Sequence, residues 1–292
     1  MTRESKIKEN SITLIFAVVC LLFIIPVVLL FSISFSKESD IAAYGYSLIP
    51  KTISFDAYKY LFNNPKQLID AYIVTFEFTI MRTVLSLLLM SMCAYALMRK
   101  DFKGRKFVSF YLYFTCLFSG GLVPSYILIT QYLHLQDNIW VYILPSLIAP
   151  MYVFMIRTNF QSLPNEVVES ARVDGAGDYR IFFQIILPLS KPVLATVALF
   201  TFLGSWNDWN TSMLYINNRD DLISLQYLMQ RLLMNIELLK DPSIAAYMGN
   251  VEVPAETTRM AMAVVTTGPV LVVFPFFQKY FTKGMTVGSV KG

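Results

Sequence analysis

The residue types that usually catalyse reactions or bind metals are sparse in this chain. It has a single histidine, His134, which excludes a multi-histidine metal site and disfavours histidine-based nucleophilic catalysis. Its three cysteines, Cys20, Cys93 and Cys116, lie in apolar runs without paired spacing, as small core residues do. The sequence therefore predicts no catalytic residue and no metal site.

The sequence also lacks a nucleotide-binding motif. No Gly-Lys dipeptide occurs, so the phosphate-binding loop of nucleotide triphosphatases is absent. Gly175-Ala176-Gly177 begins like a dinucleotide-binding motif, but Arg180 stands where the third glycine would be. We therefore expect no cofactor in this chain.

The composition of the chain indicates membrane-spanning helices. Of 292 residues, 55% are apolar and only 15% are charged, and the mean hydropathy is +0.53. Soluble domains contain about 25% charged residues. The long runs with few or no charges are close to the length of about 20 residues that a bilayer requires.

These runs predict an all-α integral membrane protein with six transmembrane helices. A short cytoplasmic N-terminus, residues 1–11, precedes a single transmembrane domain, residues 12–292. We place the spans at 12–35, 71–98, 107–130, 139–158, 192–216 and 259–280. The first span is longer than the apolar part of a secretory signal, and no small-residue cleavage site ends it, so we interpret it as a retained anchor.

The distribution of Lys and Arg predicts that both termini are cytoplasmic. With this orientation 15 basic residues lie in inner segments and seven in outer segments. Because positively charged loops stay on the cytoplasmic side, the opposite orientation is disfavoured. An outer loop at 217–258 is then long enough to serve either as a lid or as a docking surface for a partner.

Polar residues within the spans could line a translocation path. Charged groups in a span are costly and tend to face the bundle interior or a wet cavity. Arg82 could favour an anionic sugar, neutralise a carboxylate or cap a broken helix. Glu77 is five residues away and not on the same helix face, so a carboxylate partner is expected elsewhere. The stretch Trp206-Asn207-Asp208-Trp209 combines aromatic and hydrogen-bonding groups that suit sugars, although the tryptophans also fit an interfacial belt.

The cytoplasmic loop at 159–191 has the pattern of two short helices joined by a glycine turn. Pro164 suits a first helical position, and 165–173 is expected to be helical until Asp174-Gly175-Ala176-Gly177 ends it. A second helix is expected at 179–187, before Pro188. From the pattern alone, the loop is either an ordinary structured connection or a docking element.

The residues of this loop resemble a known signature. Glu169-Ser170-Ala171-Arg172-Val173-Asp174-Gly175-Ala176, with Phe182 and Ile186-Leu187-Pro188 downstream, is similar to the EAA motif of the membrane subunits of binding-protein-dependent ABC importers. The resemblance covers the whole chain and is nearest to carbohydrate permeases of the maltose type. Within them it looks most like the branch for complex or acidic oligosaccharides, such as alginate or aldouronate importers. Ser170 departs from the motif's second alanine but is also small.

The resemblance implies a permease subunit in the bacterial cytoplasmic (inner) membrane that imports oligosaccharides by alternating access and is not an enzyme. It implies that the loop is a coupling helix that contacts an ATPase through Glu169, Ser170, Ala171, Asp174, Gly175 and Ala176. The implied partners are a second related permease, two ATPase subunits that bind ATP and Mg, an extracytoplasmic solute-binding protein, and the lipid bilayer, with no nucleic acid. The substrate pathway would include Arg82, Trp206, Asn207, Asp208 and Trp209.

A solitary ion-coupled transporter is the alternative function. Such a protein is expected to have paired carboxylates near the middle of the membrane or repeated broken spans. This chain offers little beyond Glu77, Arg82 and Asp208 within its spans.

Overall fold

A computed structural model describes residues 3–239 and 254–288, and its regular elements are helices. The α-helices are α1 (Arg3–Ser34), α2 (Glu38–Tyr44), α3 (Asp56–Leu61), α4 (Pro65–Met98), α5 (Arg105–Leu117), α6 (Leu122–Ile127), α7 (Pro150–Gln161), α8 (Asn165–Val173), α9 (Asp178–Ile181), α10 (Leu187–Leu189), α11 (Lys191–Trp206), α12 (Asn210–Tyr215), α13 (Leu225–Leu239) and α15 (Ala255–Gly288). Within the described ranges, strand pairing is limited to an isolated bridge between Ser36 and Ile53. The prediction of an all-α protein is confirmed.

Parts of two predicted segments fall outside the described residues. The outer loop predicted at 217–258 contains residues 240–253, and the N-terminal segment contains residues 1 and 2, none of which is described. The same holds for residues 289–292 at the end of the chain.

Three helices are long and apolar enough to cross a membrane: Ile12–Ser34 within α1, the whole of α4, and Ala255–Lys279 within α15. Three further pairs of helices meet the same criterion together but are bent. These pairs are α5 with Leu122–Tyr132, Ile139–Ser146 with α7, and Asp178–Leu189 with α11, bent by 117°, 51° and 82°. The described residues thus contain three clear spans, or six if each bent pair is one span.

Two of the bends interrupt segments that the sequence predicts to be continuous helices. The range 107–130 is divided between α5 and α6 because Gly120-Gly121 follows α5 and Gly121 has φ +89°, a conformation that is costly for other residues. Pro188 does not end the second inner helix as expected. It lies at the start of α10, where its missing N–H is tolerated, and the chain bends at Ser190 instead.

The chain forms two compact units. The first comprises residues 1–68 and 229–269. In it, Glu38 accepts hydrogen bonds from the backbone N–H groups of Glu256 and Thr257, at 2.9 and 3.0 Å, and so caps the start of α15. Arg259 on α15 pairs with Glu237 on α13 at 3.1 Å. These contacts join the first turns of α15 to α2 and to α13.

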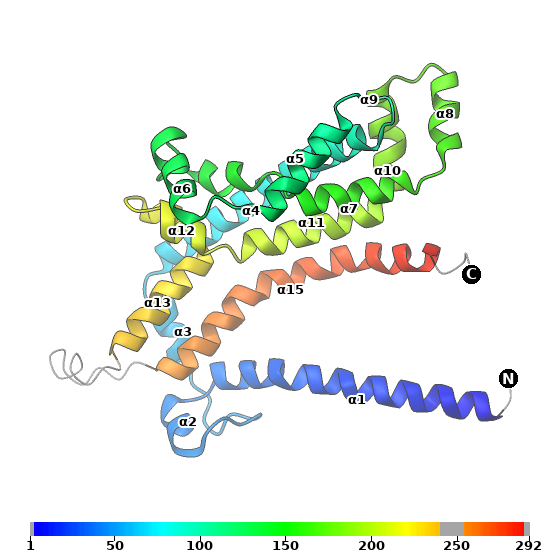
Figure 1. Cartoon of the computed structure of the whole chain (residues 1–292). Helices are drawn as coiled ribbons and strands as arrows, with labels where there is room; N and C mark the ends of the chain where they lie inside the picture. The colour runs from blue at the N-terminus through cyan, green and yellow to red at the C-terminus, as the bar shows by residue number, and fades with distance from the viewer. Residues whose placement is uncertain (1–2, 240–253, 289–292) are drawn as a thin grey trace. The chain divides into compact units, whose positions relative to one another are not determined.

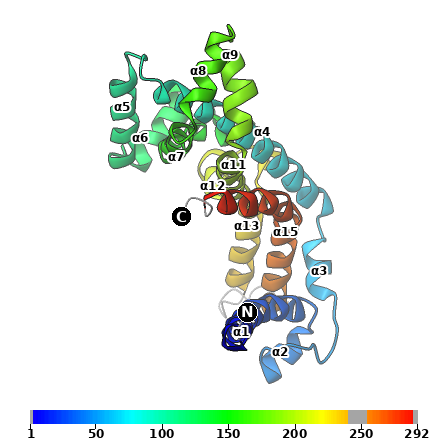
Figure 2. The same ribbon diagram turned by 90° about the vertical axis from the view of Figure 1, so that its right-hand side faces the viewer.

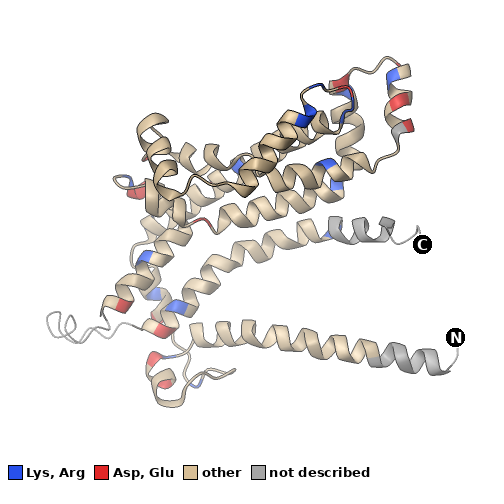
Figure 3. Ribbon diagram, in the orientation of Figure 1, with Lys and Arg blue, Asp and Glu red and all other residues tan. Residues whose placement is uncertain are grey.

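The second unit comprises residues 69–228 and 270–292. Here α7 packs against both α11 and α5, and α7 and α11 run side by side, as Figures 1 and 2 show. Figure 3 shows the charged residues of this unit gathered around α8, α9 and the start of α5 at one end, and near α12 at the other. A buried cluster of side chains from α4, α5, α7, α8, α9 and α11 forms the core next to α8 and α9.

Candidate functional site

Helix α8 covers 165–173, as the sequence predicts, and its termini are locally stabilised. Pro164 is the N-cap, one residue before the position expected for it. Glu166 lies in the first turn and Arg172 in the last turn, where each charge complements the helix dipole. Although α8 is short, its ends are therefore well defined.

The turn after α8 is a Schellman motif. The N–H of Ala176 donates to the carbonyl of Ala171 at 2.9 Å, and the N–H of Gly175 donates to the carbonyl of Arg172 at 3.0 Å. Gly175 has φ +78°, which strains any residue with a Cβ. A Cβ at this glycine would contact nothing within 4 Å, so within this chain the backbone conformation, not crowding, requires glycine.

The residues assigned to the coupling loop separate into two groups. Glu169, Ser170, Asp174 and Gly175 are exposed. Ala171 is only 9% exposed and belongs to the buried core cluster, while Ala176 packs against that cluster. The first group is available to a partner, and the alanines fix the loop to the rest of the unit.

Side chains at and just after the ends of α4 and α9 connect this loop to the transmembrane helices. Arg99 forms ion pairs with Asp101 and with Asp178, the first residue of α9. Tyr95 packs against Phe182 with ring centroids 5.3 Å apart. No local pattern in the sequence marks Arg99 or Asp178 as functional, because their contact joins residues 79 positions apart.

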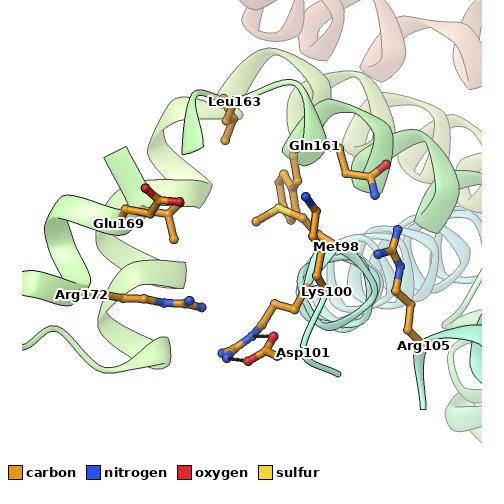
Figure 4. Close-up of a pocket in the computed structure, with 11 residues that line it drawn as sticks. Met98, Lys100, Asp101, Arg105, Gln161, Leu163, Glu169 and Arg172 are labelled. Carbon is orange, nitrogen blue, oxygen red and sulfur yellow. Dashed lines mark hydrogen bonds and ion pairs between the residues drawn. The ribbon is translucent and has the colours of Figure 1, made fainter. Parts of the chain in front are cut away.

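A cavity of about 450 Å³ lies between α8, the end of α7 and the turn from α4 to α5. Figure 4 shows Arg105 and Gln161 on one side of it and Glu169 and Arg172 on the other. Glu169 of the proposed coupling motif therefore lines a charged cavity.

The second candidate region is the break between α11 and α12. Asp208 lies in this break, and its carboxylate is 3.4 Å from the guanidinium of Arg82 on α4. The same carboxylate accepts hydrogen bonds from the N–H of Thr211 at 3.0 Å and from its hydroxyl at 2.8 Å, which caps the start of α12. The structure thus gives Arg82 a carboxylate partner, which is one of the three roles left open by the sequence.

The four residues of the Trp206–Trp209 stretch differ in exposure. Trp206 is 1% exposed and packs against Phe76 and Phe202, with ring centroids 5.0 and 6.1 Å away. Trp209 is 39% exposed, and Asn207 is also exposed and accepts a hydrogen bond from Gln226 at 3.2 Å. Asn207 and Trp209 are therefore accessible in this chain, whereas Trp206 is part of the packing.

A buried hydroxyl network holds this break in place. The hydroxyls of Tyr142 and Ser212 are 2.5 Å apart, and Ser212 donates to Ser224 at 3.0 Å. Ser224 in turn donates to the backbone carbonyl of Asp208 at 2.9 Å. Sequence reasoning missed this network, because single Ser and Tyr residues in apolar runs give no spacing signal.

No group of three or more His, Cys, Asp or Glu side chains in residues 3–239 and 254–288 could hold a metal ion. Glu77, the remaining charged residue of the second span, is exposed.

Comparison with known proteins identifies the class. Residues 5–287 match the family of binding-protein-dependent transport system inner membrane components. Protein LplC of Bacillus subtilis (strain 168) is 39% identical over 271 residues, covering 92% of this chain and 90% of LplC. The polygalacturonan/rhamnogalacturonan transport system permease protein YtcP of the same organism is 38% identical over 282 residues, covering 96% and 95%.

A solved structure agrees with these relatives. A chain from the crystal structure of a bacterial ABC transporter involved in the import of the acidic polysaccharide alginate has a TM-score of 0.79 and 27% identity to this chain. The match covers 96% of this chain and 99% of that chain.

This chain belongs to the family of binding-protein-dependent transport system inner membrane components. It is a multi-pass permease subunit of an ABC importer in the bacterial cytoplasmic membrane and not an enzyme. An importer of this class also comprises a partner permease, an ATPase and a binding protein. The solitary ion-coupled transporter receives no support from these relatives.

Proposed function

We propose that this chain is one of two related permeases that import acidic oligosaccharides by alternating access. The supporting observation is its likeness, over nearly its full length, to proteins named for uronate-containing polymers. One is the polygalacturonan/rhamnogalacturonan permease at 38% identity, and the other is the alginate importer chain at a TM-score of 0.79.

The α8–α9 loop is the proposed contact to an ATPase. Glu169, Ser170, Asp174 and Gly175 are exposed on it, while Ala171 and Ala176 pack inward. Two ATPase subunits would bind ATP and Mg, and their closure would move this loop as a rigid body. Closure can shift the importer between its states only to the extent that the nucleotide has different affinities for them.

The proposed orientation places both termini and the α8–α9 loop in the cytoplasm. It is supported by 15 basic residues in the inner segments against seven in the outer ones. The outer loop at 217–258 would then face the solute-binding protein. Single cysteines placed at Lys103 and at Asn218 test this: an impermeant thiol reagent added outside intact cells should label only the second.

The proposed sugar contacts in this chain are Asn207 and Trp209. The exposed indole offers an apolar face to a sugar ring. The Asn207 amide accepts from Gln226 and donates to the carbonyl of Leu203, which leaves one N–H and one lone pair for sugar hydroxyls. Arg82 is compensated by Asp208, so this break presents no unpaired cation to a sugar carboxylate. Recognition of the substrate's charge would therefore lie mainly with the binding protein or the second permease.

Uptake into proteoliposomes tests the proposal. The purified importer, its binding protein and internal ATP are supplied with labelled oligogalacturonides or with neutral arabino-oligosaccharides of equal length. We expect ATP-dependent uptake of the acidic sugar that the neutral sugar does not reduce. Equal transport of the neutral sugar would contradict the acidic substrate, and uptake without the ATPase would contradict the importer mechanism.

A further inference from the structure

We propose that the cavity beside α8 binds the phosphate of an anionic phospholipid headgroup from the cytoplasmic leaflet. The proposal rests on the proposed orientation of the chain, which places this cavity at the inner membrane surface. The cavity has a volume of about 450 Å³ and lies between α8, the end of α7 and the turn from α4 to α5.

The charges lining the cavity leave positive charge uncompensated. Four cations and two carboxylates line it: Arg99, Lys100, Arg105, Arg172, Asp101 and Glu169. Arg99 is occupied by Asp101 and Asp178, and Arg172 is 3.9 Å from Asp178. Among the described residues, Lys100 and Arg105 form no ion pair with a carboxylate. Guanidinium and ammonium groups of this kind are the usual ligands of phosphate.

Two neighbouring groups add hydrogen-bond donors to this positively charged lining. Gln161 lines the cavity with a side-chain amide, opposite Glu169 and Arg172 in Figure 4. One turn earlier on α7, Arg157 donates to the hydroxyl of Ser109 at 3.1 Å, and its buried Nε has no hydrogen-bond partner. The guanidinium of Arg157 is thus only partly hydrogen-bonded, one turn from the cavity lining.

Exposed aromatic residues close in sequence to these cations favour a lipid over free phosphate. Phe102 lies in the same turn, and Phe107 and Phe110 follow on α5, with 39%, 74% and 65% of each residue exposed. Cations at the headgroup level followed by exposed rings along a helix match a phosphate joined to acyl chains. Basic pockets at the cytoplasmic ends of transmembrane helices bind anionic headgroups in this way.

The position of the cavity allows a bound lipid to influence the α8–α9 loop. Glu169 and Arg172 belong to α8, whereas Lys100 lies in the turn after α4 and Arg105 begins α5. A phosphate bound by Arg172 together with Lys100 and Arg105 would hold α8 against the ends of α4 and α5, because four cations line the cavity against the two carboxylates of Asp101 and Glu169. Binding of the lipid should therefore stabilise the orientation of the α8–α9 loop, which is proposed to contact the ATPase.

The test compares lipid retention by two double variants of the complete importer. Lys100→Gln/Arg105→Gln removes the two unpaired cations, and Lys103→Gln/Lys106→Gln removes the same charge from the same turn without touching the cavity lining. Each complex is placed in nanodiscs of phosphatidylcholine with about a quarter phosphatidylglycerol, and the phospholipid retained after extraction is measured by native mass spectrometry.

We expect wild type and the Lys103/Lys106 variant to retain phosphatidylglycerol and the Lys100/Arg105 variant to retain about tenfold less. Lys100→Arg/Arg105→Lys keeps the charge and should restore retention, which distinguishes lost binding from misfolding. Equal retention by both Gln variants overturns the proposal, because it indicates a general basic surface.

Two other outcomes also overturn it. Displacement of the lipid by millimolar inorganic phosphate alone would assign the cavity to free phosphate. Loss of the ATPase from the Lys100/Arg105 variant with full lipid retention would assign it to an acidic side chain of that partner. If no ATPase co-purifies with the wild-type chain, the proposed function has failed. Lipid retention is measured on the same sample, so the two proposals fail separately.

Discussion

Arg99, directly after α4, forms ion pairs with both Asp101 in the following turn and Asp178 at the start of α9. Hydrogen bonds from Arg99 lower the pKa of Asp101 to about 2, so this carboxylate is charged at any physiological pH. Bonds to Asp101 and then to Asp178 raise the pKa of Arg99 above its ordinary value. A single guanidinium thus joins a transmembrane helix to the loop proposed to contact the ATPase.

Asp178→Asn should weaken this connection without removing the exposed face of α8. We expect the ATPase to remain bound, while the amount of sugar imported per ATP hydrolysed falls severalfold, because loop movement reaches α4 less directly. Uptake and hydrolysis are measured together in proteoliposomes. Asp101→Asn is the matched control, since it removes a bond of Arg99 within its own turn and should leave this ratio near wild type. A ratio unchanged in Asp178→Asn would contradict the role of the contact.

The Arg82–Asp208 pair should be required for stability. Both side chains are about one-sixth exposed, and removing one partner leaves the other charge largely buried. Arg82→Gln is expected to destabilise the unit by about 2–4 kcal/mol, seen as a lower melting temperature in detergent. Arg82→Gln/Asp208→Asn should recover part of this loss. If Arg82→Gln is stable but raises KM for acidic sugars alone, Arg82 contacts substrate instead.

Trp206 and Trp209 should respond differently to truncation. Trp206→Ala should cost about 3–5 kcal/mol, because the buried ring leaves a cavity between Phe76 and Phe202. Trp209→Ala should leave the melting temperature almost unchanged and lower uptake roughly two- to tenfold, as expected for the loss of an aromatic contact of about 0.5–1.5 kcal/mol. Unchanged uptake by Trp209→Ala would remove this residue from the proposed sugar path.

Asp137 should make the α12 end of the second unit sensitive to acid. Burial raises its pKa, but hydrogen bonds from the N–H groups of Asn217 and Asn218, at 2.6 and 3.0 Å, outweigh this and hold the pKa below its ordinary value. A lowered folded-state pKa gives stability that is present above the unfolded value of about 3.9 and is lost as pH falls through the folded value.

Asp137→Asn keeps a residue that tolerates the left-handed φ of 55° but removes the charge. The difference in melting temperature between wild type and this variant should be constant above about pH 5 and should shrink at lower pH. A difference that does not change with pH would show that the charge of Asp137 is not involved.

The sequence predicted features that depend on local pattern. Apolar runs indicated the membrane helices, and Pro164 with Gly175 defined α8 between them, because backbone preferences act over a few residues. The bend after α5 could have been found from Gly120-Gly121, since consecutive glycines in a span permit a turn.

The contacts between distant segments could not be predicted. Asp208 was identified as a polar residue in a span, yet its partner Arg82 is 126 positions away. The same is true of Tyr142 and Ser212, which are 70 positions apart. Such pairs depend on how the helices pack, and one sequence without its folded structure does not specify which polar residues meet.

The central claim, that the α8–α9 loop binds the ATPase, is tested most directly by co-purification from native membranes. Tagged wild type is compared with Gly175→Trp, which places a large side chain on the exposed turn, and with Lys103→Trp, which places it on the neighbouring inner turn. We predict that wild type and Lys103→Trp bring down a second permease and an active ATPase, while Gly175→Trp loses the ATPase. Retention of a fully active ATPase by Gly175→Trp, or its absence from wild type, would contradict the account.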